Sequence, residues 1–427
     1  MRSRTRGSRL AALLTVPLAA VAWLGLSPSP AAATGPSTPD AVLSHLQEIS
    51  GSHVVSGVHN KEPLADPSRY TAQAHDLTGK WPGLWGGELG FRADDVAQRQ
   101  ALVNQAKTEW ANGSLVSLTW HMCRPDVATC EFEGGINGSR LSDSEWQQLT
   151  TDNSALNKAF KAKLDTAVPY LTQLKDAGVP VLFRPLHEMN EGWAWWGGRP
   201  GANGSARLFR ITHDYLESKG LDNILWVWAP KDVQGGASQA ASYYPGDAYV
   251  DVVGLDVWWA KFPSSDWYNA LSALAGSKPM ALAEVGSVPQ PSQLAAQPKW
   301  VYWNVWLDYL TNSGYNTNAS VKAGYYDARV LNQGEVHIPT GGTNPPATPS
   351  GPLTGVGGKC VDVAGSGTAN GTVVQLHGCN GTAAQKWAVA SDGSLRALGK
   401  CLDVTGQGTV NGTKLQLWEC NGSGAQR

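Results

Sequence analysis

The clearest indication of the fold is a stretch that runs Pro180-Val-Leu-Phe-Arg-Pro-Leu-His187-Glu188. Its apolar start predicts a buried strand at residues 180–184, and a histidine and a carboxylate stand just after the end of that strand. The stretch Pro279-Met-Ala-Leu-Ala-Glu284 repeats this arrangement further along the chain. Buried strands that end on ionisable side chains are typical of parallel sheets with functional groups at the carboxyl ends of their strands.

Short β-rich runs of this kind alternate with helical patterns throughout residues 36–338. Apolar residues spaced three to four positions apart predict helices at 96–110, 155–174 and 206–216. Eight strands, each followed by a helix, predict an α/β fold of the (β/α)8 TIM barrel type. A doubly wound open sheet is the alternative, but residues 51–60 lack the Gly-rich phosphate loop that usually follows its first strand. The expected strands are 54–58, 83–85, 115–120, 180–184, 224–228, 250–255, 279–283 and 300–306.

Ionisable or aromatic residues recur at the expected strand ends. In a (β/α)8 barrel the active site lies at the carboxyl ends of the strands, so these residues are expected to meet at one face. In strand order they are His59, Glu88, His121, His187 with Glu188, Asp232, Asp256 with Trp258, Glu284, and Trp303 with Trp306.

Glu188 and Glu284 are the catalytic candidates among these residues. Each directly follows an apolar strand, so its carboxylate is expected to be partly desolvated, and we expect the two to oppose each other across the barrel opening. Two carboxylates about 5–5.5 Å apart perform double displacement at a glycosidic bond. One attacks the anomeric carbon, and the other, with a raised pKa, protonates the leaving oxygen and then activates water. A buried salt bridge is the alternative for either residue alone, and the nearby Trp193, Trp195 and Trp196 favour catalysis.

Two segments resemble glycoside hydrolase family 26. Its acid/base segment is similar to Arg184-Pro-Leu-His187-Glu188-Met-Asn190-Glu-Gly-Trp193-Ala-Trp-Trp196-Gly, and its nucleophile segment is similar to Ala283-Glu284-Val-Gly. Endo-β-1,4-mannanases dominate this family, which belongs to a clan of retaining (β/α)8 glycosidases. The resemblance implies that Glu188 is the acid/base, that Glu284 is the nucleophile and that His187 orients the catalytic centre. It further implies sugar contacts from His121, Trp193 and Trp303, the last as part of a subsite floor.

One position departs from the family pattern. The family usually has Gly-x-Asp-x-Tyr after the sixth strand, with the Tyr hydroxyl bonded to the nucleophile, whereas this chain has Gly254-Leu-Asp256-Val-Trp258. An indole N–H donates a hydrogen bond but cannot accept one. Either Trp258 supplies the donor from a shifted position, or the nucleophile is held otherwise. Because of this change, β-1,3-xylan and mixed-linkage β-glucan remain alternatives to mannan as the substrate.

These observations together predict an endo-β-1,4-mannanase that uses a retaining mechanism. Neither a metal nor an organic cofactor is expected, because the chemistry is proton transfer and carboxylate attack. The endo mode rests on tryptophan, since 16 of the 19 indoles fall in residues 36–338 and could stack on several sugars. A non-catalytic polysaccharide-binding protein is the alternative from another class. A net charge of −2 argues against nucleic acid as a partner, and a monomer is expected.

The N-terminal residues 1–33 have the three parts of a secretory signal peptide. Arginines precede an apolar run over residues 10–26, and the segment ends on Ala31-Ala32-Ala33. A membrane anchor is the alternative, although the apolar run is short for a span of about 20 residues. We therefore expect cleavage, secretion to the extracellular space and no membrane association of the mature protein.

The six cysteines fit an oxidising compartment. They form three local pairs, and an even number in a secreted chain predicts disulfides. Zinc is the alternative, but no Cys-x-x-Cys or Cys/His cluster has ligand spacing. The first pair is expected to close a small loop beside His121. The pairs are Cys123 with Cys130, Cys360 with Cys379, and Cys401 with Cys420.

A second module is expected at residues 352–427, after a Pro/Gly/Thr-rich linker at 339–351. Its sequence repeats at an offset of 41, so that Cys360-Val-Asp362-Val matches Cys401-Leu-Asp403-Val. The Cys-x-Asp-Val, Asn-Gly-Thr and Gln-x-Trp signatures resemble ricin-type β-trefoil lectin repeats, which act as carbohydrate-binding modules. Three repeats close a trefoil and the second one here stops at Arg427, so an incomplete all-β module is expected.

The lectin resemblance also implies which residues contact sugar. The family's sugar-binding Asn before the Gln of Gln-x-Trp is replaced by Ala384 in the first repeat and by Ala425 in the second. Repeats that are structural and bind little sugar are therefore the alternative. The implied sugar contacts are Asp362, Gln375, His377, Gln385, Asp403, Gln416, Trp418 and Gln426.

Overall fold

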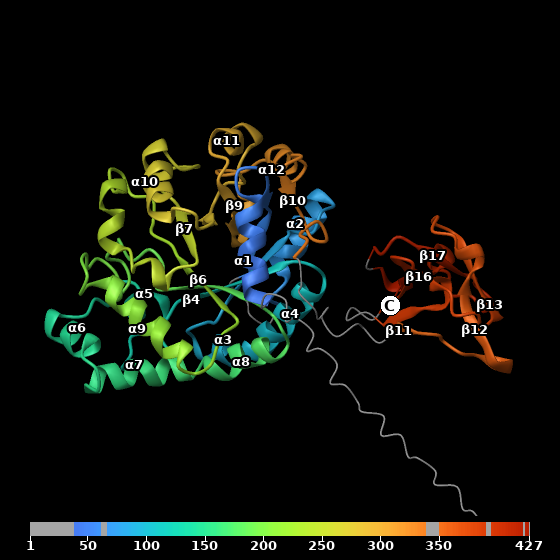
Figure 1. The fold of residues 1–427 in the computed structure, drawn as a ribbon, viewed down its shortest axis with the longest axis horizontal. Helices are drawn as coiled ribbons and strands as arrows, with labels where there is room; N and C mark the ends of the chain where they lie inside the picture. The colour runs from blue at the N-terminus through green and yellow to red at the C-terminus, as the bar shows by residue number, and fades with distance from the viewer. Residues whose placement is uncertain (1–37, 61–65, 339–349, 390–393, 422, 427) are drawn as a thin grey trace, which may run out of the picture. The chain divides into compact units, whose positions relative to one another are not determined.

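The computed structural model describes residues 38–60, 66–338, 350–389, 394–421 and 423–426 (Figure 1). The expected signal peptide at 1–33 and the expected linker residues 339–349 lie outside the described residues. None of the described helices combines the length and the apolar character that a membrane crossing requires.

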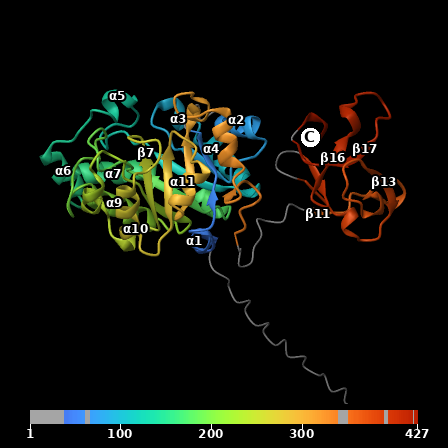
Figure 2. The ribbon, with the colours of Figure 1, turned by 90° about the horizontal axis from the view of Figure 1, so that it is seen from above.

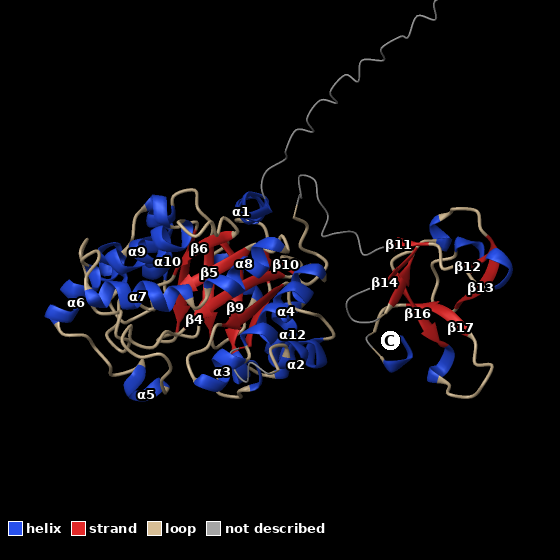
Figure 3. Cartoon of the chain, turned by 90° about the horizontal axis from the view of Figure 1, so that it is seen from below, coloured by secondary structure: helices blue, strands red, loops and turns tan. Residues whose placement is uncertain are grey.

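Eight parallel strands form a closed barrel: β2 (Gly57–Asn60), β3 (Leu84–Glu88), β4 (Leu115–Trp120), β5 (Val181–Pro185), β6 (Ile224–Trp228), β7 (Val252–Val257), β8 (Met280–Val285) and β9 (Trp300–Trp306). Each strand pairs with the next along the chain, and β9 also pairs with β2, which closes the ring. Helices surround the strands (Figure 3). The predicted (β/α)8 barrel is confirmed.

The first predicted strand, 54–58, is in fact two strands. β1 (Val54–Val55) pairs with β10 (Val330–Leu331) and with β9, whereas β2 pairs with β3. Ser56 separates them, and its hydroxyl donates to Asn332 Oδ1 at 3.0 Å and accepts from the Gly83 amide at 3.1 Å. These two hydrogen bonds of Ser56 connect the first strands of the barrel to Asn332, which lies in the segment after α12.

The helices of the barrel module alternate with its strands, as the apolar spacing predicted. The predicted helix 155–174 is in fact two helices, α7 (Ala155–Asp165) and α8 (Val168–Asp176), because Pro169 has no amide hydrogen to continue the first helix and lies in the first turn of the second. They are α1 (Thr38–Ile49), α2 (Arg69–Thr78), α3 (Ala93–Ala97), α4 (Arg99–Ala111), α5 (Phe132–Gly135), α6 (Asp143–Thr150), α7 (Ala155–Asp165), α8 (Val168–Asp176), α9 (Ser205–Glu217), α10 (Ser265–Ala275), α11 (Pro291–Ala296) and α12 (Asn318–Tyr325), with shorter 3₁₀ helices η1 (Ala237–Tyr243), η2 (Asp247–Tyr249) and η3 (Leu307–Thr311).

Helix α1 closes the end of the barrel at which the strands begin. Its apolar side chains Val42, Leu46 and Ile49 join the buried cluster that contains Leu84 and Leu182 of the strands. Helix α5, in the loop after β4, lies at the opposite end (Figure 2). The end at which the strands finish is therefore the end left for the functional site.

The C-terminal module is a curled antiparallel sheet of short strands, consistent with a trefoil. Its two repeats have the same register, with β12 paired to β13 and β16 paired to β17 in the same way. Ser350 and Gly351 already pair with the sheet, so the module begins two residues before the predicted boundary. Its strands are β11 (Ser350–Gly351), β12 (Lys359–Val363), β13 (Thr372–Gly378), β14 (Trp387–Val389), β15 (Leu395–Ala397), β16 (Lys400–Val404) and β17 (Leu415–Trp418), with 3₁₀ turns η4 (Val356–Gly358), η5 (Ala364–Ser366), η6 (Ala383–Gln385), η7 (Thr405–Gln407) and η8 (Gly424–Gln426).

All three predicted cysteine pairs form disulfides. The Cα atoms of each pair lie 5.0–5.8 Å apart. In the trefoil the two bridges occupy equivalent places in the two repeats, and in the barrel one bridge closes the loop that follows β4. The pairs are Cys123–Cys130, Cys360–Cys379 and Cys401–Cys420.

Candidate active site

A cavity of about 370 Å³ lies at the carboxyl ends of the barrel strands. Most of its wall comes from residues at or just after the ends of β4 to β9, as the strand-end pattern predicted. It contains both catalytic candidates together with aromatic, imidazole and amino groups. The lining residues are His121, Phe132, Asn137, His187, Glu188, Glu191, Trp193, Lys231, Trp258, Glu284, Trp306 and Tyr309.

The backbone around Glu188 is held in an unusual conformation. Leu186 and Glu188 both have positive φ, at 52° and 51°, which costs about 1–3 kcal/mol for each non-glycine residue. The Glu188 amide donates to the Ala229 carbonyl at 2.8 Å, and the Trp196 indole donates to the His187 carbonyl at 2.8 Å. These bonds fix the turn after β5, and the turn projects the Glu188 carboxylate into the cavity.

The Glu188 side chain is buried and faces a second carboxylate. Burial, and then the negative charge of Glu284, raise the pKa of Glu188 to about 7, while Lys231, Trp193 and Arg184 oppose this shift. Trp193 Nε1 donates to Glu188 Oε2 at 2.7 Å, and Lys231 Nζ lies 3.5 Å from the same oxygen. A carboxyl group with this pKa can hold a proton near neutral pH and then release it.

Both oxygens of Glu284 accept hydrogen bonds. Arg184 Nη2 donates to Oε2 at 2.5 Å, and Trp258 Nε1 donates to Oε1 at 2.9 Å. The structure therefore answers the question raised by Trp258, because its indole supplies the donor at the position where the family pattern has tyrosine. The two bonds orient the carboxylate as an attacking group requires.

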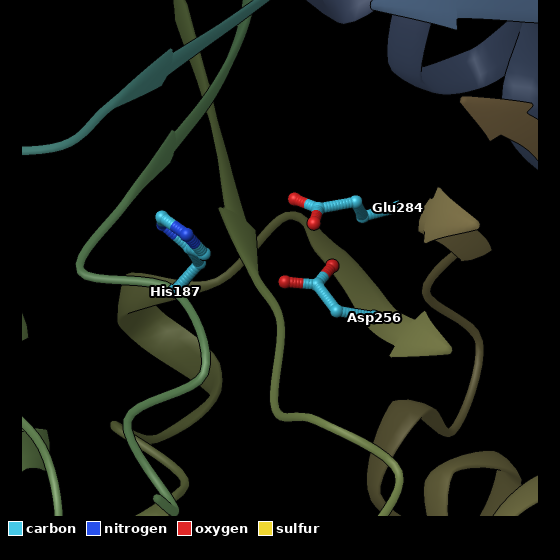
Figure 4. Close-up of side chains that lie close together, drawn as sticks. All are labelled: His187, Asp256 and Glu284. Atoms are coloured by element: carbon cyan, nitrogen blue, oxygen red, sulfur yellow. The ribbon is translucent and has the colours of Figure 1, made fainter. Parts of the chain in front are cut away.

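Arg184 links Glu284 to a second, fully buried carboxylate. Its other guanidinium nitrogen forms an ion pair with Asp256, which has no exposed surface. Burial raises the pKa of Asp256 well above its usual value, although Arg184 opposes that effect. The neighbouring carboxylates of Asp256 and Glu284, with His187 facing them, have atoms close enough together to hold a cation (Figure 4). The Arg184 guanidinium already forms an ion pair with each of these carboxylates.

Asp232 holds the loop that carries Trp258. Its Oδ1 accepts from the backbone amides of Trp258 at 2.5 Å and Trp259 at 2.8 Å, and its Oδ2 accepts from Ala260 at 3.0 Å. The carboxyl group is buried, so these three bonds replace its lost hydration. Asp232 thus acts on the site through the indole that contacts Glu284.

His59, Glu88 and His121 support the opposite side of the cavity. Glu88 Oε2 lies 2.7 Å from His121 Nδ1, and Glu88 Oε1 accepts from the His121 amide at 2.8 Å. His59 is fully buried and stacks on the Trp306 indole, with ring centroids 4.3 Å apart. His59 therefore lies behind the cavity wall rather than in the groove, and Trp306 forms the surface.

Lys231 is locked between two segments of the site. Asn190 Nδ2 donates to the Lys231 carbonyl at 2.9 Å, and the Lys231 amide donates to Asn190 Oδ1 at 2.8 Å. Lys231 Nζ lies 2.9 Å from Glu191 Oε2. The segment that carries Glu188 therefore fixes the cation that faces it.

Trp303 is not part of a subsite floor, and this prediction is wrong. Its side chain is fully buried and packs against Tyr325 of α12, with ring centroids 6.0 Å apart. Trp306, three residues later, lines the cavity instead. Trp195 and Trp196 are also fully buried, so much of the tryptophan excess lies in the core rather than in a groove.

In the trefoil, the polar residues of the two signatures bind one another. The Asp362 carboxylate accepts from Gln375 at 3.2 Å and from Gln385 at 3.1 Å, and Asp403 accepts from Gln416 and Gln426 in the same way. Gln385 and Gln426 are buried and also accept from the backbone amides of Asn380 and Asn421. The sugar contacts expected from Gln385 and Gln426 are therefore wrong, because these two side chains hold loops inside the module. His377 and Trp418 remain exposed.

Several site residues escaped the sequence interpretation. Arg184 had a usable signal, since a charged residue within an apolar strand indicates a buried ion pair. Lys231 directly precedes Asp232 and could have been found by the strand-end pattern. Asn137 comes from a loop, and Phe132 and Tyr309 come from the short helices α5 and η3, whose positions no periodic pattern predicts.

Two family models match the chain. The model of Glycosyl hydrolase family 26 matches residues 33–335, and that of the ricin-type beta-trefoil lectin domain matches residues 349–427. These are the families that the motifs resemble.

Two curated relatives are named as mannan endo-1,4-beta-mannosidases. The mannan endo-1,4-beta-mannosidase of Bacillus subtilis (strain 168) is 28% identical over 324 residues, which are 69% of this chain and 84% of that protein. The mannan endo-1,4-beta-mannosidase A and B of Caldalkalibacillus mannanilyticus is 32% identical over 339 residues, 72% of this chain and 61% of that protein.

Solved structures agree with the fold. The structure of GH26A from a Muricauda species has a TM-score of 0.66 and 29% identity, and the match covers 72% of this chain and 100% of that one. The Podospora anserina GH26-CBM35 beta-(1,4)-mannanase has a TM-score of 0.60 and 29% identity, with coverage of 71% and 68%.

Proposed function

The chain belongs to glycosyl hydrolase family 26, and on that basis we propose that it is an endo-β-1,4-mannanase with a retaining mechanism. The observation that carries the mechanism is the contrast between two carboxyl groups in one cavity. Glu188 has a pKa of about 7, whereas Glu284 accepts hydrogen bonds from Arg184 and Trp258. Two relatives named as mannan endo-1,4-beta-mannosidases support the choice of substrate.

In the first step, Glu284 attacks the anomeric carbon and the glycosidic bond breaks. Protonated Glu188 gives its proton to the leaving oxygen, and the sugar becomes esterified to Glu284. The Trp258 indole, held by the Asp232 loop, keeps Glu284 aimed at the reacting carbon.

Burial and then the negative charge of Glu284 raise the pKa of Glu188, and in the second step the ester has removed that charge. That pKa then falls, so Glu188 stays a carboxylate after it has given up its proton. It acts as the general base: it takes a proton from water while the water oxygen attacks the anomeric carbon and the ester bond to Glu284 breaks. Lys231 and Trp193 both favour the carboxylate form of Glu188 and therefore assist this step. The released sugar keeps its original configuration, and Glu284 is free again.

The remaining expectations extend this proposal. The protein is a secreted monomer that loses residues 1–33, and residues 352–427 attach the enzyme to polysaccharide. Support for attachment comes from the lectin-domain match and from the exposed His377 and Trp418 side chains.

Reducing-sugar release from mannan, β-1,3-xylan and mixed-linkage glucan tests the proposal. Wild-type protein should cleave mannan fastest, and Glu188→Gln and Glu284→Gln should each lose about a hundredfold or more in rate. Glu48→Gln, on the exposed face of α1 at the other end of the barrel, is the matched control. No release from any β-glycan by wild-type protein would leave a polysaccharide-binding protein, and faster cleavage of xylan or glucan would change the substrate.

A further inference from the structure

A second cavity, of about 570 Å³, lies between the loop after β6, the loop after β7 and the first turns of α10. Both loops leave the barrel at the carboxyl ends of their strands, so this cavity is on the same face as the active site. It is lined by tryptophan, amide and carboxyl side chains, among them Gln234, Trp259, Asp266, Trp267 and Asn269. None of these side chains has a role in the active site described above.

The loops after β6 and β7 separate the two cavities and form the wall between them. Lys231 and Trp258 line the active-site cavity, whereas the residues that follow them, Asp232 and Trp259, line the second cavity. Consecutive residues of each loop thus point to opposite sides of the wall. Asp232 ties the two loops together through the backbone amides of Trp258, Trp259 and Ala260.

Trp259 exposes an unusually large apolar surface at this wall. Its side chain is 65% exposed, whereas Trp267 beneath the cavity is 4% exposed and donates to the Val233 carbonyl at 3.1 Å. A rigid indole held by a fixed backbone binds a flat ligand with little loss of conformational entropy. The exposed Gln234, Asp266 and Asn269 side chains add hydrogen-bonding groups around that indole. An apolar face surrounded by amides and carboxylates suits the ring of a neutral sugar.

We propose that the Trp259 cavity binds a sugar unit of the same polysaccharide chain that is cleaved next door. The occupant follows from the shared wall, because a chain that leaves the active-site cavity past Trp258 meets Trp259 immediately. The Trp259 indole stacks on the sugar, and the amide and carboxyl groups bind its hydroxyls. This inference rests on the proposed function, since it assigns one more position to the same substrate.

A ladder of β-1,4-linked mannooligosaccharides of increasing length tests the proposal. In wild-type protein kcat/KM should rise with length and reach a plateau. In Trp259→Ala, kcat/KM should reach its plateau at a chain one sugar unit shorter than in wild-type protein. For long chains its kcat/KM should be about fivefold lower than that of wild-type protein, whereas for the shortest cleaved substrates the two values should be equal. Trp259→Phe, which keeps a smaller ring, should fall between the two. The bond that is cleaved in a reducing-end-labelled chain should also shift in Trp259→Ala, because one binding position has lost its anchor.

The control is Trp81→Ala. Trp81 is 40% exposed and stacks on His75, but it precedes β3 at the other end of the barrel. Its loss should therefore leave the dependence of kcat/KM on chain length unchanged. Equal plateaus and equal cleavage positions for wild type and Trp259→Ala would overturn the proposal, as would an equal loss at every chain length. Failure of wild-type protein to cleave any member of the ladder overturns the proposed mannanase function instead, and the same ladder built from the glycan that is cleaved then tests Trp259.

Discussion

Replacing Lys231 by methionine should change the pH dependence of the reaction. Lys231 Nζ lies 3.5 Å from Glu188 Oε2 and favours the carboxylate form of Glu188. The acid step needs protonated Glu188, so activity in wild-type protein should fall as the pH rises through about 7. Methionine keeps most of the apolar length of lysine but has no charge, so Glu188 should hold its proton to a higher pH.

The size of the shift follows from the separation of the charges. Two unit charges 3.5 Å apart interact by about 5 kcal/mol at an effective dielectric constant of 20 and by about 1 kcal/mol in bulk water. The lower figure applies here, because the Lys231 side chain is 25% exposed and Glu191 at 2.9 Å already neutralises much of its charge. One pKa unit corresponds to about 1.4 kcal/mol, so the basic limb should move upward by about one pH unit.

The assay is kcat/KM on a soluble mannooligosaccharide, measured from acid to alkaline pH. Lys231→Arg should keep the wild-type limb, since it keeps the charge. Glu191→Gln should move the limb to lower pH, because it removes the carboxylate that competes with Glu188 for Lys231. A basic limb that stays in place in Lys231→Met, or that moves the same way in Glu191→Gln, would refute this account of Glu188.

Three further variants test other parts of the structure. Trp258→Phe removes the donor to Glu284 Oε1 and should lower kcat about tenfold or more with little change in KM, whereas a change in KM alone would contradict an orienting role. Burial raises the pKa of Glu109 from 4.5 to about 7, so the folded protein retains a proton that the unfolded chain releases between these pH values, and stability falls as pH rises through that window. Glu109→Gln should therefore raise the free energy of unfolding by about 3 kcal/mol above pH 7 and by almost nothing near pH 4, as measured by urea denaturation. The paired change Cys123→Ser with Cys130→Ser should cost about 2 kcal/mol of stability, and an unchanged melting temperature would show that this loop needs no constraint.

Much of the barrel could be predicted because its strands are continuous apolar runs that end on polar residues. The strands at 115–120, 224–228 and 300–306 have the predicted limits. The same property explains the error at Trp303. Side chains alternate along a strand, so Trp303 and Trp306 point to opposite sides, but a strand buried on both faces carries no polar alternation that shows which side is which.

The catalytic candidates were predictable because each lies near the carboxyl end of a buried strand, Glu188 three residues after β5 and Glu284 at the next-to-last position of β8. The polar network around them was not, since Arg184 with Asp256, and Asn190 with Lys231, pair residues that are far apart in the chain. Tryptophan content gave a misleading indication of a long groove. Composition counts indoles but does not distinguish a buried ring such as Trp195 from one that lines the cavity, such as Trp193.

The most direct test of the proposed mechanism is to trap the covalent intermediate. Glu188→Ala lacks the base for the second step, so an aryl β-mannoside with a good leaving group should load the enzyme faster than water releases the sugar. Mass spectrometry of the digested protein should then find one hexosyl adduct, on the peptide that contains Glu284. An adduct on another residue, or a product of inverted configuration released without any adduct, would contradict the assignment of Glu284 as the nucleophile.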